Sequence, residues 1–316
     1  MSRVLGVDGG QSGTRLRDSD GREAAAAGVS RLEGDTVRAL ADALTAAWQL
    51  GGFERVDRAV LGLTTAPADT AAADRLCALV SDTTGASEVW LADDAVTSHA
   101  GALSLGWGVS VVGGTGVACL ALPAAGDARI MGGHGFLLGD EGGGFWIGRR
   151  ALAAILRARE GRDPRGELAG GGLVQAAELR FGPLDEIPAR LHTIERPVDA
   201  IAAFAQDVLE ACDEDDHVAV EVVDDAAAEL VLLVAAASRL AGADRVTVPL
   251  ALGGRLLTDG TPLRGRLDEA LGRADFAVSA RTADRSPVEG AVMLGLSDEP
   301  GRYGSLVHCW RQEVTV

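Results

Sequence analysis

The feature that most constrains the fold is a β-hairpin pattern with a glycine-rich turn, which occurs once at the start of each half of the chain. The first turn spans residues 8–14 (DGGQSGT) and the second spans residues 113–116 (GGTG). After each hairpin, strand-like apolar runs alternate with helical patterns. This alternation predicts an α/β protein with mixed sheets, and the recurring hairpin indicates two related halves.

Apolar periodicity and turn residues give the expected order of elements. In the first half we expect strands over 3–7, 14–18 and 23–29, helix 35–50, strand 58–63, helix 68–83, strand 88–92 and helix 95–105. In the second half we expect strands over 108–113, 117–122 and 128–131, a helix-rich stretch over 145–240, strand 246–252, helix 264–273, strand 276–280 and helix 288–296.

Two absences from the composition exclude whole classes of phosphate chemistry. The chain has no lysine and no asparagine, so all 29 cationic side chains are arginine. A Walker-type phosphate loop and Schiff-base chemistry need lysine, and a protein kinase needs lysine and asparagine. If this chain handles phosphate, it must use glycine backbones, hydroxyl groups, Mg²⁺ and arginine.

Charge, cysteine spacing and hydropathy limit which partners and which cellular compartment this chain can have. A net charge of −17 argues against a nucleic-acid partner, because proteins that bind nucleic acid normally have a basic surface. The four cysteines lie far apart and form no metal or disulfide pattern, and no apolar run approaches the length of a membrane span. With no signal peptide at the N-terminus, we expect a cytoplasmic protein that does not enter a membrane.

The first glycine-rich turn is a candidate phosphate loop. Glycines between two strands let the backbone approach an anion, and hydroxyl groups add donors. Asp8, at the end of the strand, could hold Mg²⁺ through water. The alternative is an ordinary hairpin, and the same alternative applies to the second turn. The candidate phosphate ligands are Gly9, Gly10, Ser12, Gly13 and Thr14 in the first turn, and Gly114, Thr115 and Gly116 in the second.

Two further motifs stand at the ends of expected strands. Asp93 and Asp94 open a helix, so that one carboxylate can cap the helix while the other points into a cleft and takes a proton from a hydroxyl group. Capping alone is the alternative. Gly253 and Gly254 follow the strand 246–252, where a nucleoside could lie flat on the backbone, or where the chain simply turns.

The stretch 132–149 (GGHGFLLGDEGGGFWIGR) combines many glycines with two adjacent acids, Asp140 and Glu141. Acids near the start of a helix can serve capping alone, but glycines on both sides exceed what a cap needs. His134 lies between glycines; a lone histidine is most often structural, and here it is also a candidate ligand.

Taken in order, these motifs resemble the N-acetylglucosamine kinase family, which groups with the ATPase subunits of benzoyl-CoA reductase in the superfamily of sugar kinases, actin and heat-shock chaperones. The resemblance rests on VDGGQSGTR, ADDA, GGTG, GGHGFLLGDEGGGFWIGR, ALGG and SPVEGAVMLG, spread from Gly6 to Leu296. It implies a duplicated ribonuclease-H-like fold with two lobes around an ATP cleft. The lobes would be residues 1–107, onto which the segment 297–316 could pack back, and 108–296, with a helical insertion over about 150–240.

The resemblance also implies roles for the residues of the motifs. Asp94 would be the general base that takes the proton of a sugar hydroxyl, and Asp8 would lie near Mg²⁺. The two turns would hold the phosphates of ATP, with Gly253 and Gly254 beside the adenosine. Contacts to the sugar would come from Gly132, Gly133, His134, Asp140 and Glu141, with Asp94.

Two departures from the family pattern matter. The family's asparagines that hold N-acetylglucosamine would fall near Ser30–Arg31 and at Val117–Ala118, and this chain has none. Glucosamine and N-acetylmuramic acid therefore stand as rival acceptors, the latter because Arg31 could face its acidic substituent. The cysteines also lack the close spacing of the iron–sulfur cluster of the reductase-activating relatives.

The sequence-based prediction is therefore an ATP- and Mg²⁺-dependent kinase of an amino sugar, acting at the 6-hydroxyl group and forming a homodimer. A second reading is a nucleotide-binding regulator or sugar sensor of the same fold without turnover. A third is an acidic scaffold whose glycines serve only as turns, which would require the ordered motif matches to be coincidental.

Overall fold

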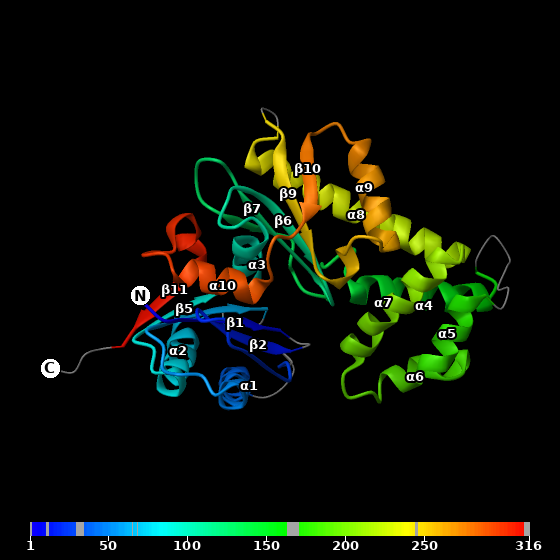
Figure 1. The fold of residues 1–316 in the computed structure, drawn as a ribbon. Helices are drawn as coiled ribbons and strands as arrows, with labels where there is room; N and C mark the ends of the chain where they lie inside the picture. The colour runs from blue at the N-terminus through cyan, green and yellow to red at the C-terminus, as the bar shows by residue number, and fades with distance from the viewer. Residues whose placement is uncertain are drawn as a thin grey trace.

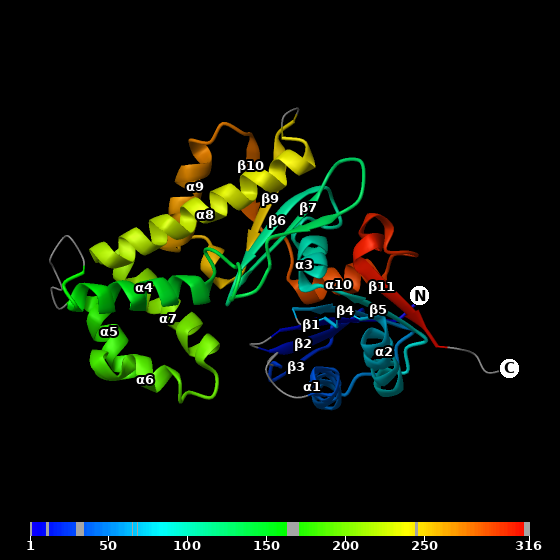
Figure 2. The same cartoon turned by 180° about the vertical axis from the view of Figure 1, so that it is seen from behind.

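The computed structural model describes residues 2–10, 13–29, 35–64, 66–67, 69–162, 171–243 and 246–312. Two lobes lie side by side, each built on one β-sheet with helices against it (Figures 1 and 2). The candidates Gln11, Ser12, Ser30 and Arg31 lie outside the described residues.

The N-terminal lobe starts with three antiparallel strands. Its elements are β1 (Val4–Gly9), β2 (Thr14–Asp18), β3 (Glu23–Ala26), α1 (Thr36–Gly51), β4 (Arg58–Leu63), α2 (Thr70–Thr84), β5 (Glu88–Ala92) and α3 (Asp94–Ala102). Aspartates at the N-caps of α1, α2 and α3 accept hydrogen bonds from backbone N–H groups of the first turn, which satisfies donors that the helix leaves unpaired.

The second lobe repeats this order, with extra helices inserted. Its elements are β6 (Gly108–Gly113), β7 (Val117–Leu122), β8 (Arg129–Met131), α4 (Gly144–Arg159), α5 (Gly172–Phe181), a 3₁₀ turn (Leu184–Glu186), α6 (Ile187–Leu191), α7 (Pro197–Asp213), α8 (His217–Ala241), β9 (Val248–Gly253), a 3₁₀ turn (Arg255–Leu257), α9 (Pro262–Gly272) and β10 (Val278–Thr282). The chain ends with α10 (Pro287–Gly295), a 3₁₀ segment (Gly301–Leu306) and β11 (Val307–Arg311).

Five strands of the first sheet have the same topology as the five strands of the second. The first has the strand order β11-β5-β4-β1-β2-β3 and the second has β10-β9-β6-β7-β8. In both, the first two strands form an antiparallel hairpin, and the first strand pairs in parallel with the fourth. The duplicated ribonuclease-H-like fold is thus confirmed. β11, which the motif analysis did not foresee, pairs antiparallel with β5 and extends the first sheet.

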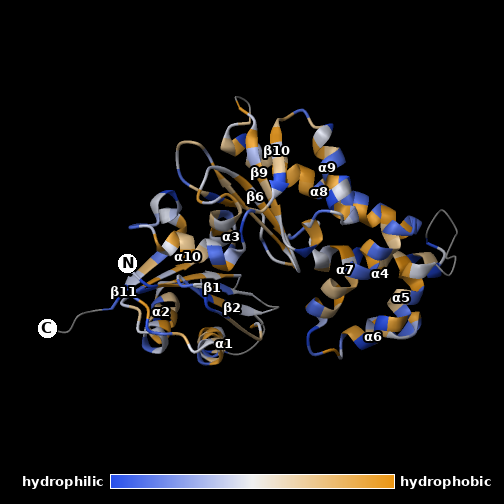
Figure 3. Ribbon diagram, viewed as in Figure 1, coloured by the Kyte–Doolittle hydropathy of each residue, from blue (hydrophilic) through white to orange (hydrophobic). Residues whose placement is uncertain are grey.

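Both faces of the first sheet are covered, which explains why β1 is apolar at successive positions. Leu5 and Val7 pack with α1 and α2 on one face, and Val4 packs with α3 and α10 on the other. Hydrophobic and hydrophilic residues alternate along the helices of both lobes (Figure 3). In α1 and α4 the buried residues recur at the spacing of one helix face.

The chain returns to the first lobe through α10, which packs against α3. The two helices approach at glycines: a Cβ at Gly101 would lie 2.5 Å from the carbonyl oxygen of Ser286, and one at Gly290 would collide with the carbonyl oxygen of Thr97. Glycine therefore lets the backbones of α3 and α10 come into direct contact. This crossing fixes α3, whose first residue is Asp94.

Candidate active site

The first glycine-rich turn joins β1 to β2 and has the geometry of a tight hairpin. Gly9 pairs with Thr14, and the N–H of Gly10 donates a 2.9 Å hydrogen bond to the carbonyl of Gly13. The hydroxyl oxygen of Thr14 is buried, with no hydrogen-bond partner among the described residues. Buried polar atoms normally have partners, so this hydroxyl fits a bound ligand.

Two carboxylates, Asp8 and Asp94, lie near enough to each other beside this turn for their charges to interact. Burial of Asp8, with a smaller contribution from the negative charge of Asp94, raises the pKa of Asp8 to about 6, against the opposing effect of Arg15. The guanidinium of Arg15 lies 3.5 Å from the Asp8 carboxylate. A half-enclosed pair of like charges at a strand end is a donor set that suits a hard divalent cation. The described residues contain no cluster of three or more acidic, histidine or cysteine side chains placed to hold a metal.

The carboxylates of the neighbouring residues Asp93 and Asp94 accept hydrogen bonds from different partners. The Asp93 carboxylate accepts a 3.0 Å hydrogen bond from the N–H of Ala95 and caps α3. Asp94 accepts a 2.6 Å hydrogen bond from the hydroxyl of Thr64. Capping therefore accounts for Asp93, and Asp94 remains the candidate base.

The second glycine-rich turn joins β6 to β7, where the N–H of Gly114 donates to the carbonyl of Gly116 at 2.9 Å. The start of α4 is bonded to it: the N–H groups of Gly144 and Phe145 donate to the carbonyls of Gly114 and Thr115, each at 2.9 Å. The glycine-rich stretch before α4 thus lies directly against this turn.

That stretch keeps an unusual backbone between β8 and α4. Asp140 has φ near 60°, a left-handed conformation that is uncommon outside glycine. The glycines of the stretch let it approach its neighbours: a Cβ at Gly116 would collide with the Asp140 carboxylate, and one at Gly142 would lie 2.8 Å from Leu230 of α8. The N-cap of α4 is Gly143, without a side-chain cap, so Asp140 and Glu141 do not serve as that cap.

Among the other candidates in this stretch, Gly132 and Gly133 have positive φ, and His134 and Glu141 are exposed. Gly132 lies against Leu233 of α8, where a Cβ would meet the leucine at 3.3 Å. The structure therefore leaves this edge of the site open to solvent.

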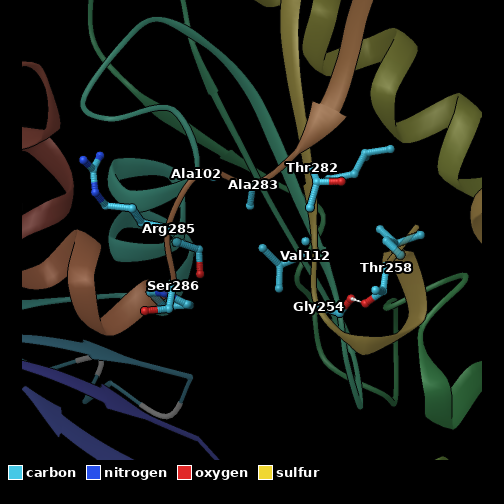
Figure 4. Close-up of a pocket in the computed structure, with 13 residues that line it drawn as sticks. Ala102, Val112, Gly254, Thr258, Thr282, Ala283, Arg285 and Ser286 are labelled. Carbon is cyan, nitrogen blue, oxygen red and sulfur yellow. Dashed lines mark hydrogen bonds between the residues drawn. The ribbon is translucent and has the colours of Figure 1, made fainter. Parts of the chain in front are cut away.

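A cavity of about 300 Å³ lies beside the pair Gly253–Gly254. Gly254 has φ near 82°, and a Cβ there would collide with the carbonyl of Gly113, so the pair lies against the second turn. Figure 4 shows Arg285 and Ser286 on one side of the cavity and Gly254 and Thr258 on the other, with Val112 and Ala283 between them. Thr258 donates a 3.1 Å hydrogen bond to the carbonyl of Gly254.

Most of the residues that line this cavity were not among the candidates predicted from the sequence. Ser98 and Ala102 come from α3, Thr282 is the last residue of β10, and Arg285 and Ser286 lie between β10 and α10. The sequence feature that could have indicated this wall is the Ser-Pro pair at 286–287. It starts a helix with a capping box shortly after a strand, so it predicts a turn at the end of the sheet.

Comparison with known proteins gives consistent matches. A family model described as the BadF/BadG/BcrA/BcrD ATPase family matches residues 5–295. An N-acetylmuramic acid/N-acetylglucosamine kinase from Clostridium acetobutylicum is 28% identical over 175 residues, which are 54% of this chain. That match spans only 55% of the length of the curated relative.

Solved structures match over nearly the whole chain. A candidate N-acetylglucosamine kinase from Chromobacterium violaceum is 27% identical, with a TM-score of 0.70, over 93% of this chain and 99% of that one. A second, from Porphyromonas gingivalis, is 18% identical, with a TM-score of 0.69, over 92% and 97% of the two chains. At 18% identity, the similarity to the Porphyromonas gingivalis protein shows a shared fold and nothing further.

Proposed function

Since this chain belongs to the BadF/BadG/BcrA/BcrD ATPase family, we propose that it is an ATP-dependent kinase that phosphorylates an amino sugar. The observation that carries the proposal is the placement of α3. Its first residue is Asp94, and Ser98, four residues later on the same helix, lines the cavity beside Gly254. Four residues of helix rise roughly 6 Å, so a nucleoside in this cavity would have its phosphates near the carboxylate.

In this proposal the nucleoside occupies the cavity beside Gly253 and Gly254, and its phosphates lie between the two glycine-rich turns. The backbone N–H groups of these turns and the hydroxyls of Thr14 and Thr115 supply the donors, since lysine is absent. Asp94 accepts the proton of the sugar hydroxyl as the oxygen attacks the γ-phosphate, and the bond from the γ-phosphorus to the leaving ADP oxygen breaks. The chain contributes mainly positioning and charge neutralisation.

Mg²⁺ fits beside the Asp8 carboxylate, because a divalent cation there would relieve the repulsion between Asp8 and Asp94 while Asp94 remains the base. When bound, such a cation would neutralise phosphate charge. Asp8 would hold the cation, directly or through water.

The acceptor is proposed to be N-acetylglucosamine or glucosamine at the 6-hydroxyl group, held by residues of the stretch 132–141. N-acetylmuramic acid is a further candidate, because the Clostridium acetobutylicum relative is described as a kinase of both N-acetylated sugars. The described chain contains no helix long and apolar enough to cross a membrane. We retain a cytoplasmic homodimer as the proposed form of the protein.

The test is ADP release with a panel of glucosamine, N-acetylglucosamine, N-acetylmannosamine, N-acetylmuramic acid and glucose, measured with a coupled assay. Turnover with at least one amino sugar, well above that with glucose, supports the proposal. A regulator or sugar sensor of the same fold would instead gain thermal stability with a sugar or nucleotide and release no ADP. A protein that binds no nucleotide at all would be a scaffold.

A further inference from the structure

Thr64 joins the first glycine-rich turn to the candidate base. It follows β4, and its backbone N–H donates a 3.0 Å hydrogen bond to the carbonyl of Gly9, which continues the parallel pairing of β1 with β4. Its hydroxyl donates the 2.6 Å hydrogen bond to Oδ2 of Asp94. One residue therefore contacts both the phosphate turn and the carboxylate.

The surroundings of Thr64 fix its side chain closely. A Cβ at Gly10 would lie 3.1 Å from the Thr64 hydroxyl oxygen, so the turn passes directly beside it. Threonine is branched at Cβ and has restricted χ1 rotamers, and its backbone here is held by the sheet. The hydroxyl therefore has little freedom to leave the carboxylate.

The helix that carries Asp94 is brought to Thr64 by a second close contact. A Cβ at Gly62 would collide with the side chain of Thr97, so α3 sits directly on β4 two residues before Thr64. The distance between Thr64 and Asp94 is thus set by the packing of α3 on the sheet rather than by a loop.

We propose that Thr64 is a positioning residue for phosphoryl transfer, which fixes the Asp94 carboxylate relative to the first phosphate turn. The inference rests on the proposed kinase function. The bond from Thr64 occupies Oδ2 and restrains the carboxylate, and Oδ1 is the oxygen that would accept the proton of the acceptor hydroxyl. A base held in this way keeps its orientation without an entropic cost at each turnover.

The experiment compares Thr64→Val, which keeps the branched shape without the hydroxyl, with Thr64→Ser, which keeps the hydroxyl. We expect Thr64→Val to lower kcat by about 10- to 100-fold while the KM values for ATP and sugar stay within about threefold, because misorientation of a base affects the reaction step. Thr64→Ser should recover most of kcat. Thermal unfolding of both variants identifies any that fail to fold.

The same substitution in an Asp94→Asn background separates positioning from a general structural effect. If Thr64 acts through Asp94, Thr64→Val should lower the residual rate of Asp94→Asn by less than about twofold. Equal kcat for the wild type and Thr64→Val, or an undiminished effect in the Asp94→Asn background, would overturn this inference and leave the kinase proposal standing. Absence of turnover by the wild type with every sugar would overturn both.

Discussion

The backbone N–H of Phe145 donates a 2.9 Å hydrogen bond to the carbonyl oxygen of Thr115, so the start of α4 is fixed to the second glycine-rich turn. The adjoining bond from Gly144 to Gly114 has the same length. Because the stretch with Asp140 and Glu141 leads directly into α4, the candidate sugar residues and the candidate phosphate residues share one backbone framework. A change in this framework should therefore affect both substrates together.

The substitution Gly116→Ala tests this shared framework. Its Cβ would collide with the Asp140 carboxylate, which must then move away from the turn. We expect kcat/KM to fall by about 10- to 100-fold for both ATP and sugar, because small displacements in a preorganised site are costly. Gly114→Ala is the matched variant, since its Cβ meets nothing within 4 Å, and it should have a clearly smaller effect. Equal losses for the two variants in steady-state kinetics would contradict the argument.

Asp94→Asn removes the candidate base while keeping the size of the side chain. We expect kcat to fall by about 100- to 10,000-fold, which is the usual contribution of a general base, with nucleotide affinity retained. Coupled ADP release measures the first quantity and equilibrium binding of a fluorescent nucleotide analogue measures the second. The control is Asp93→Asn, which preserves the capping of α3 because asparagine also caps helices, and which should keep most of the activity. Similar rates for the two variants would remove Asp94 as the base.

Asp8→Asn tests the proposed cation site. Replacing a carboxylate ligand by an amide removes charge that a divalent cation prefers. We expect the Mg²⁺ concentration for half-maximal activity to rise by about 10- to 100-fold, measured by Mg²⁺ titration at saturating ATP and sugar. Asp127→Asn, on an exposed loop between β7 and β8, is the control and should leave the titration unchanged. A wild-type titration curve for Asp8→Asn would exclude Asp8 from the cation site.

The parts of the fold that local signals determine could be predicted from the sequence. The hairpins at 8–14 and 113–116 are specified by glycines in the turn and apolar residues beside it, and both occur as expected. Strands 58–63, 88–92, 108–113 and 117–122 have the predicted bounds. β11 was not recognised as a strand, because its only described pairing is with β5, more than 200 residues earlier in the chain.

The candidate site was predictable as motifs but not as a set of contacts. Nothing near Thr64 in the sequence indicates that its hydroxyl meets Asp94, since the two residues are 30 positions apart and the contact depends on how α3 packs on β4. The bonds between the start of α4 and the second turn have the same origin. Sequence periodicity places residues on a face of an element, and only the packing of elements decides which faces meet.

His99 provides a pH-dependent contribution to stability. Burial lowers the pKa of His99 to about 4 from the ordinary 6.5. Its Nδ1 lies 2.8 Å from the Tyr303 hydroxyl and its Nε2 lies 3.3 Å from the Gly108 carbonyl, so the neutral ring donates from Nε2 and accepts at Nδ1. Between pH 6.5 and pH 4, His99 is protonated in the unfolded chain and neutral in the folded chain. The stability contributed by neutral His99 is therefore lost as the pH falls from 6.5 to 4.

The lowering of the His99 pKa from 6.5 to about 4 corresponds to about 3 kcal/mol in the free energy of unfolding. We expect His99→Gln to be less stable than the wild type at pH 7, with the difference shrinking by about that amount by pH 4, because glutamine does not titrate. Urea unfolding at several pH values measures both proteins. A difference that stays constant from pH 7 to pH 4 would show that His99 does not titrate in this window.

The crossing of α3 and α10 at Gly101 and Gly290 should be essential to stability and to the position of Asp94. In Gly290→Ala the new Cβ would collide with the backbone of α3 at Thr97 and Gly101, and rigid backbone cannot move aside as a side chain can. We expect a loss of about 1–3 kcal/mol in the free energy of unfolding, typical of overpacking. The helices must separate to relieve the clash, which shifts α3, so kcat should fall as well.

Gly265→Ala provides the matched comparison for this substitution. Gly265 lies on α9, is exposed, and has open space around its Cβ position, so alanine there should stabilise the helix by about 0.5–1 kcal/mol. Urea unfolding should therefore show that the free energy of unfolding falls in Gly290→Ala and rises in Gly265→Ala, although both substitutions replace glycine by alanine. The clash displaces α3, the helix that begins with Asp94. Loss of stability in Gly290→Ala without any change in kcat would therefore mean that the crossing stabilises the first lobe but does not set the position of Asp94.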